Sequence, residues 1–152
     1  TAVLFAAGTQ LGALASGADA AMQQKLYDYG MHLGYAFQIA DDVLDYTADA
    51  ADLGKNLGDD LAEGKATLPL IHAITHSHEP VRSRLRDIVE NGDGKAMPEV
   101  LAAIRATGGL EYSQRRAAEY ANAAETALDG LPENEAIAAL RGLARYAVER
   151  KN

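Results

Sequence analysis

Apolar residues recur along this chain with the spacing of about 3.6 residues that is typical of α-helices. The alternation of apolar and polar residues that indicates half-buried strands is absent from the sequence. Short runs containing glycine or proline interrupt the helical pattern, and such runs mark helix ends. We therefore predict an all-α fold, a helical array of about seven helices that forms a single domain over residues 1–152.

The predicted helices are joined by short turns, except for one long polar loop at about residues 48–64. They cover about residues 1–15, 20–47, 66–76, 80–91, 96–106, 110–129 and 134–149. Asp19 is a suitable N-cap for the second helix. Pro69 is tolerated in the first turn of the third helix because that turn needs no amide hydrogen there.

Leucines mark the faces that we expect to be buried. In the first helix these are Leu4, Leu11 and Leu14, with Gly8, Gly12 and Ala15 allowing close contact between helices. In the second helix they are Leu26, Leu33, Phe37, Ala40 and Leu44. The apolar content, 48% of 152 residues, is enough for the core of one domain.

Charge and cysteine content exclude several classes of function. The net charge is −8 and there is no stripe of lysine or arginine, so we expect no nucleic-acid partner. The chain has no cysteine, which rules out thiol catalysis and a disulfide framework and fits a cytoplasmic protein. Every apolar run ends well before about 20 residues, so we expect no transmembrane segment.

Three aspartates, Asp41, Asp42 and Asp45, interrupt the apolar second helix. Asp41 and Asp45 lie one above the other on a helix, and Asp42 is offset by about 100°. Gln38 lies one turn before Asp42. Stacked carboxylates repel one another and are costly to bury, so an apolar helix tolerates them where a cation neutralises them. Oxygen ligands favour Mg²⁺, which shares its coordination with water and phosphate oxygens; for the cluster alone, a solvated acidic face is the alternative.

Two Gly-Lys pairs follow the aspartates, at Gly54-Lys55 and Gly64-Lys65, with Asp60 between them. The lysines supply positive charge for phosphate groups. The glycines allow backbone N–H groups to approach a phosphate closely. Together with the aspartates, this pattern favours a diphosphate site over a merely acidic surface.

Two other features leave alternatives open. His72 and His76 have the i,i+4 spacing of a zinc pair, but no further ligand has suitable spacing, so a pair on a helix surface is favoured. Phe37 adjoins Gln38 and is either the floor of an apolar pocket or an ordinary core residue.

The segment GYAFQIADDVLDYTADAADLGKNLGDDLAEGKATLPLIHAI, at 34–74, resembles the second aspartate-rich region of the trans-type polyprenyl diphosphate synthases, in particular the octaprenyl-like branch. TAVLF at 1–5 is similar to the Lys-Thr-x-x-Leu-Phe segment of that family without its lysine. The family has two DDxxD motifs on facing helices and an arginine pair, whereas this sequence has one DDxxD. The resemblance therefore implies the C-terminal half of an isoprenoid-synthase-type α-bundle, with the first motif upstream.

The resemblance also implies an activity, which is the Mg²⁺-dependent head-to-tail condensation of isopentenyl diphosphate with an allylic diphosphate. It implies a homodimer that contacts membranes only peripherally, through its product, and a half that is inactive alone. The implied roles are metal binding for Asp41, Asp42 and Asp45, stabilisation of the leaving diphosphate for Lys55 and Lys65, substrate binding for Phe37, orientation of the substrate or metal-bound water for Gln38, positioning of a lysine or a water for Asp60, and proximity to the reacting carbons for Thr1.

Two other classes of protein remain as alternatives. A non-catalytic subunit of a heteromeric prenyl synthase would keep the helices, but its metal motif is usually eroded, and this motif is intact. A terpene cyclase or a head-to-head synthase also uses Mg²⁺ and aspartates, but these enzymes pair DDxxD with a different second motif and do not predict the two Gly-Lys pairs.

Overall fold

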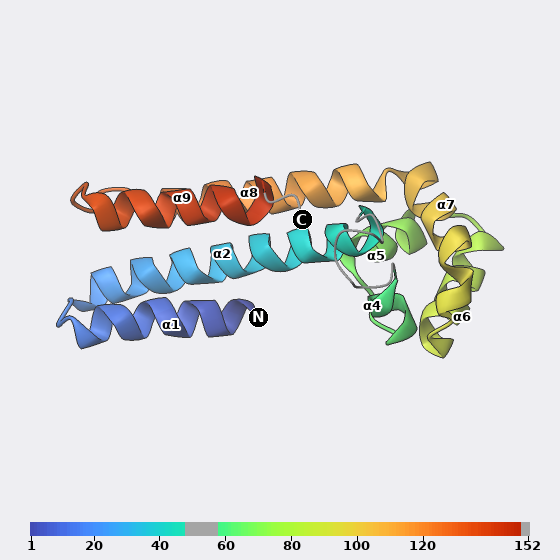
Figure 1. Cartoon of the computed structure of the whole chain (residues 1–152), viewed down its shortest axis with the longest axis horizontal. Coiled ribbons are helices and arrows are strands. Elements are labelled where there is room, and N and C mark those ends of the chain that lie inside the picture. Colours follow the sequence, from blue (N-terminus) through green and yellow to red (C-terminus); the bar gives the residue numbers. More distant parts are fainter. Residues whose placement is uncertain (48–57, 150–152) are drawn as a thin grey trace. The chain divides into compact units, whose positions relative to one another are not determined.

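The computed structural model describes residues 1–47 and 58–149, and every regular element within them is a helix (Figure 1). The helices are α1 (Ala2–Ala15), α2 (Ala20–Thr47), α4 (Asp59–Ala62), α5 (Leu68–His76), α6 (Val81–Asn91), α7 (Met97–Thr107), α8 (Gly109–Ala127) and α9 (Glu135–Glu149), with a 3₁₀ turn, η1 (Gly94–Ala96). The predicted all-α class is confirmed, and each predicted helix is present with ends within about two residues.

Local signals at helix ends account for this agreement. The Asp19 carboxylate accepts a hydrogen bond from the Met22 backbone N–H at 2.8 Å, as expected for the N-cap of α2. Pro69 lies in the first turn of α5. The polar loop predicted at 48–64 is wrong for residues 59–62, which form α4. Four residues are too few to carry a readable apolar period.

The described residues divide into two compact units, one made of residues 1–40 and 115–149, and the other of residues 41–47 and 58–114. A single domain over 1–152 stays a prediction. None of the described helices is both long and apolar enough to cross a bilayer.

In the first unit, α1 and α2 form an antiparallel hairpin (Figure 1). The two helices approach closely at glycines of α2: a Cβ on Gly30 would lie 2.6 Å from the Cα of Ala6, and a Cβ on Gly34 would lie 2.4 Å from the Cα of Ala2. The Thr9 hydroxyl bridges the pair by donating to the Leu26 carbonyl at 2.6 Å. Small residues on α2 therefore permit this contact.

The prediction that Gly8 and Gly12 of α1 serve close contact is wrong, because a Cβ at either position would meet no described atom within 4 Å. The predicted core face of α1 is also wrong. Leu4, Leu11 and Leu14 are 77%, 60% and 56% exposed. The buried residues of α1 are instead Ala6 and Ala13, which are small enough to lie against α2. A broad apolar face of α1 is left exposed in this chain.

The core of the first unit contains α2, α8 and α9. Its buried residues are Tyr29, Leu33, Ala124, Leu128, Ile137, Ala144 and Ala147. Of the stripe predicted on α2, Leu33 is buried, whereas Leu26, Phe37, Ala40 and Leu44 are only partly buried. Tyr29 replaces them at the centre because its hydroxyl finds a buried acceptor, the Leu140 carbonyl, at 2.8 Å.

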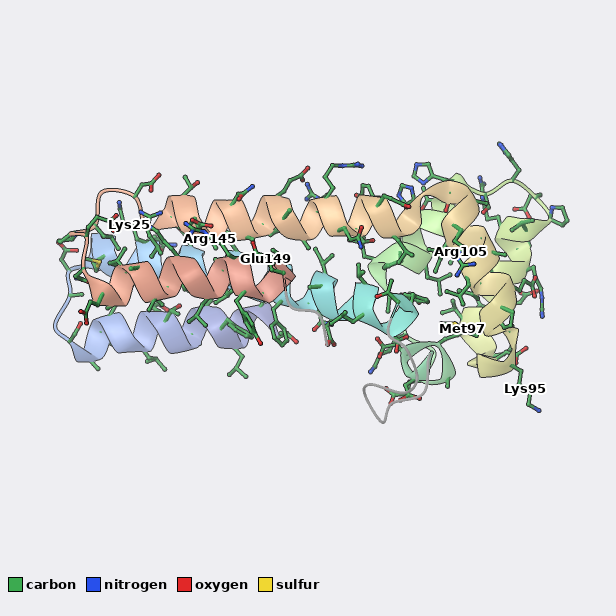
Figure 2. The ribbon with its side chains drawn as sticks, turned by 45° about the horizontal axis from the view of Figure 1, so that its top comes forward. Lys25, Lys95, Met97, Arg105, Arg145 and Glu149 are labelled. Carbon is green, nitrogen blue, oxygen red and sulfur yellow. The ribbon has the colours of Figure 1, made fainter. Side chains whose placement is uncertain are left out.

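Ion pairs join α8 to α9 in the same unit. Arg145 reaches from α9 towards α8 (Figure 2) and donates to both carboxylate oxygens of Glu125, at 2.9 and 2.7 Å. Arg141 donates to the Glu125 backbone carbonyl at 2.9 Å. The hydrogen bonds and positive charge of Arg145 hold the pKa of Glu125 below its usual value.

The second unit has its own core, built by the C-terminal end of α2 together with α4, α5, α6, η1 and α7. The buried members are Tyr46, Leu61, Leu70, Ala73, Leu85, Ile88, Ala96, Met97, Val100, Ala103 and Ile104. Met97 is buried at the start of α7, whereas Lys95 of η1 points into solvent (Figure 2). Tyr46 thus anchors the aspartate-bearing end of α2 in the core of the second unit.

Candidate functional site

The last two turns of α2 carry Asp41, Asp42 and Asp45 in partly buried positions. Val43 and Tyr46, on the same turns, are buried. Burial of these two side chains fixes the rotation of α2 about its axis, so the three carboxylates lie beside the core of the second unit instead of pointing wholly into solvent.

Asp45 is the most perturbed of the three aspartates. Its pKa is raised to about 6, mainly by burial and then by the negative charge of Asp60. The charges of Asp59 and Asp41 raise it further, and a backbone hydrogen bond from Asp60 lowers it only in part. Its Oδ2 atom is buried and has no hydrogen-bond partner among the described residues. A carboxylate in this situation is stabilised by a cation.

Asp42 makes a contact that sequence reasoning missed. Its Oδ2 atom accepts a hydrogen bond from the backbone N–H of Leu68, the first residue of α5, at 3.1 Å. The only sequence signal was the predicted start of a helix at residues 66–67, because the first N–H groups of any helix need an acceptor from elsewhere. Nothing in the sequence identifies Asp42 as that acceptor.

Tyr46 makes a second contact with the same segment. Its hydroxyl and the Thr67 hydroxyl are 2.5 Å apart, and both side chains are buried. Burial is the main cause that raises the pKa of Tyr46 to about 12, although the bond to Thr67 opposes it. This pair was also missed, since a tyrosine following an aspartate has no special signal.

Lys65 lies just before this segment and is held by two acids. Its Nζ atom is 2.6 Å from a Glu63 oxygen and 3.0 Å from Asp60 Oδ1. Hydrogen bonds to Glu63 and Asp60 raise the pKa of Lys65, so it is positively charged at neutral pH. The side chain is 57% exposed and can reach a ligand in solvent. The other lysine of the predicted site, Lys55, lies outside the described residues.

Three further residues of the predicted site lie in the first unit, namely Thr1, Phe37 and Gln38. The Thr1 hydroxyl donates to Gln38 Oε1 at 2.8 Å. The ring of Phe37 lies 5.5 Å from that of Phe5, centroid to centroid, at an angle of 39°. Thr1 and Gln38, two residues of the predicted site, are thus in contact. The functional roles of all three stay predictions.

His72 and His76 of α5 form an aromatic stack, with ring centroids 3.9 Å apart. His72 also stacks on Tyr112 at 4.4 Å, and its Nε2 lies 3.1 Å from the Thr107 carbonyl. This arrangement links α5 to the junction of α7 and α8. It agrees with the interpretation of the histidines as a structural pair.

The described residues contain no group of three or more His, Cys, Asp or Glu side chains arranged as a ready metal cluster. The aspartates of α2 could still hold a metal that takes few of its ligands from the protein. That fits Mg²⁺, which binds proteins through one or two carboxylates and completes its octahedron with water and substrate phosphate oxygens. The Asp45 Oδ2 atom has no hydrogen-bond partner among the described residues, and other carboxylates lie near it. Together they form a negatively charged site that a cation would stabilise.

Comparison with known proteins agrees with the all-α fold. The chain is 46% identical over 151 residues to the octaprenyl diphosphate synthase of Escherichia coli (strain K12), covering 99% of this chain and 47% of that protein. It is 42% identical over 150 residues to heptaprenyl diphosphate synthase component 2 of Geobacillus stearothermophilus, covering 99% of this chain and 46% of that protein.

A solved structure is also similar, namely a polyprenyl synthase from Caulobacter crescentus CB15 complexed with calcium and isoprenyl diphosphate. The TM-score is 0.89 at 41% identity, covering 100% of this chain and 47% of that one. The chain thus spans about half the length of the relatives it matches. The family model described as Polyprenyl synthetase matches residues 1–106, and the chain belongs to that family.

Proposed function

We propose that this chain carries the second aspartate-rich diphosphate site of a polyprenyl diphosphate synthase. In the complete enzyme, this site would help to condense isopentenyl diphosphate with an allylic diphosphate. The observation that carries the proposal is the partly buried Asp45, with its pKa raised to about 6 and one oxygen unpartnered among the described residues. The names of the E. coli and C. crescentus relatives support the reaction class and the diphosphate ligand.

Asp41 and Asp45 would hold Mg²⁺, whereas the third carboxylate of the predicted ligand set, Asp42, accepts a hydrogen bond from the Leu68 N–H. The C. crescentus polyprenyl synthase was solved as a complex with calcium, which supports a divalent cation that prefers oxygen ligands. When bound, the metal would neutralise charge on the diphosphate as the allylic C–O bond breaks.

Lys65 would bind the departing pyrophosphate. Glu63 and Asp60 hold its ammonium group in place of a ligand, and the exposed Glu63 carboxylate is the partner that a diphosphate can displace at least cost. Asp60 would then keep the lysine directed at the phosphate oxygens. This exchange provides positive charge where negative charge develops in the transition state.

The remaining chemistry needs no nucleophile from the protein. Cleavage of the allylic C–O bond gives a carbocation and pyrophosphate, and the C4 alkene carbon of isopentenyl diphosphate attacks the cation. A proton then leaves to the pyrophosphate, and the product is an allylic diphosphate longer by five carbons. The Thr1–Gln38 pair would orient the allylic substrate, and Phe37 would contact its apolar chain.

The complete protein is proposed to be a homodimer. The exposed leucines of α1 support burial of this helix by further polypeptide, either the rest of the enzyme or a second copy. A heteromeric enzyme is the second candidate, favoured by the relative whose name is heptaprenyl diphosphate synthase component 2. Purification of the complete protein distinguishes them: a homodimer is active alone, whereas a component needs its partner.

Calorimetric titration of pyrophosphate, with and without Mg²⁺, tests the site in this chain. We expect weak binding that requires Mg²⁺, and a loss of affinity of at least about tenfold in Asp45→Asn, because one charge-assisted contact is removed. The matched control is Asp87→Asn, which changes an exposed acid on α6 of the same unit. Binding that is independent of Mg²⁺, or equal losses in the two variants, would contradict the proposal.

A further inference from the structure

We propose that Asp42 and Tyr46 are positioning residues, which fix the start of α5, and with it Lys65, relative to the aspartates of α2. Asp42 then acts through its bond to Leu68 and is not a direct ligand of the metal. The effect on catalysis rests on the proposed function, whereas the attachment of α5 to α2 does not.

The start of α5 is capped from outside the helix. The first N–H groups of a helix have no partner within it, and a threonine at the N-cap commonly provides one. Thr67 is the N-cap of α5 and has the extended backbone of that position (φ −76°, ψ 159°), but its side chain makes no capping bond. Asp42 supplies the acceptor instead, by accepting from the Leu68 N–H at 3.1 Å.

The Thr67 hydroxyl does not cap because it is bonded to Tyr46. The two hydroxyl oxygens are 2.5 Å apart, and Thr67 is only 4% exposed. Asp42 and Tyr46 are one helical turn apart on the same face of α2, and they bind the consecutive residues Thr67 and Leu68. We call these four residues the α2–α5 clamp.

The clamp helps to fix the position of Lys65, which precedes Thr67 by two residues. The backbone N–H of Lys65 donates to the Asp60 carbonyl at 2.8 Å, and its Nζ contacts Asp60 and Glu63. The segment from Lys65 to Leu68 is therefore held by α4 at one end and by α2 at the other. A displacement of about 1 Å in such a group can reduce a catalytic rate by about 10²-fold, so this attachment has a functional consequence.

Substitution by asparagine separates the two roles of Asp42. Asparagine caps a helix about as well as aspartate, whereas its neutral amide is a weaker ligand for Mg²⁺ than a carboxylate. The experiment uses the 152-residue chain and compares Asp42→Asn and Asp42→Ala with the same two changes at Asp41. Hydrogen exchange of the Leu68 amide reports the cap, and calorimetry with Mg²⁺ and pyrophosphate reports the site.

We expect Asp42→Ala to accelerate exchange at Leu68 about five- to tenfold, and Asp42→Asn to leave it within about twofold of the wild type. In the pyrophosphate titration, Asp42→Asn should keep affinity within about threefold, whereas Asp41→Asn should lose at least about tenfold. Tyr46→Phe gives a second variant that retains the buried ring and should accelerate exchange around residues 67–68.

Unchanged exchange at Leu68 in Asp42→Ala would overturn the cap. Equal loss of Mg²⁺-dependent affinity in Asp42→Asn and Asp41→Asn would make Asp42 a ligand and overturn the positioning role. If the wild-type chain does not bind pyrophosphate with Mg²⁺, the proposed function fails, and the exchange data still decide whether the clamp exists.

Discussion

The hydroxyl of Thr1 donates a hydrogen bond to Gln38 Oε1 at 2.8 Å, joining the beginning of α1 to a residue of α2 that is 37 positions away. The family resemblance implies that Gln38 orients the substrate or metal-bound water and that Thr1 lies near the reacting carbons. Their contact means that each orients the other: Thr1 fixes the amide plane of Gln38, so a change at one position should alter the function of the other.

Removal of this bond should affect substrate use more than stability. In the complete enzyme, Thr1→Val should lower kcat/KM for the allylic diphosphate about tenfold, because the Gln38 amide loses its orientation. Steady-state kinetics at saturating isopentenyl diphosphate measures this. Thr126→Val, which removes an exposed hydroxyl bonded within α8, is the matched control and should leave kcat/KM unchanged.

The raised pKa of Asp45 makes a prediction about pH. The folded state favours the protonated form, so the cost of ionising Asp45 is absent below about pH 4, grows as the pH rises to about 6, and is complete above that value. Asp45→Asn should therefore stabilise the chain above pH 6, by about 1–2 kcal/mol after allowance for partial exposure, and have no effect below pH 4. Urea unfolding at several pH values without Mg²⁺ provides the test.

With Mg²⁺ and pyrophosphate at pH 7, the wild type should become more stable than Asp45→Asn. The bound cation stabilises the ionised Asp45 of the wild type, whereas the neutral amide of the variant binds it more weakly. A stabilising effect of Asp45→Asn that persists at pH 3.5 would show that charge is not its cause.

The contact of α1 with α2 predicts opposite effects for two glycine substitutions. Gly30→Ala places a Cβ 2.6 Å from the Cα of Ala6, so the helices must separate, at a cost of about 1–3 kcal/mol. Gly12→Ala meets no described atom within 4 Å and should stabilise α1 by about 0.5–1 kcal/mol through helix propensity. Thermal unfolding of the two variants measures the difference, and similar shifts in both would contradict the close contact.

The exposed face of α1 predicts self-association or dye binding by this chain alone. Leu4→Gln combined with Leu11→Gln should reduce both, with little loss of stability, because these side chains are 77% and 60% exposed. Leu33→Gln, which places an amide in the core of the first unit, should unfold the chain. Light scattering and fluorescence of a hydrophobic dye at micromolar concentration check this, and a wild-type monomer that binds no dye would contradict it.

Sequence reasoning succeeded where the determining interactions are local. The period of apolar residues, the cap at Asp19 and the position of Pro69 each depend on neighbours within a turn or two, which explains the accurate helix ends. The DDVLD motif, residues 41–45, could be identified from the sequence because its residue types and spacing already indicate a cation site.

Predictions from the sequence failed where contacts between distant segments determine which residues are buried or hydrogen-bonded. Leu4 and Ala6 are both plausible core residues of α1, and only the identity of the facing helix, with its Gly30 and Gly34, selects the alanine. The bond from Leu68 to Asp42 spans 26 positions, and no local pattern encodes it. Interactions of this kind depend on tertiary structure, so they could not be predicted from periodicity or capping.

The location of the metal tests the central claim most directly. Mn²⁺ can replace Mg²⁺ in the presence of pyrophosphate, and its paramagnetic broadening of backbone NMR signals reports which residues lie near it. In the wild type we predict broadening centred on Asp41, Asp45 and Lys65, and no broadening at Asp87. In Asp45→Asn we expect the broadening around Asp41 and Lys65 to be lost. Broadening centred on His72 and His76, or spread evenly over the acidic surface, would contradict a diphosphate site at the DDVLD motif.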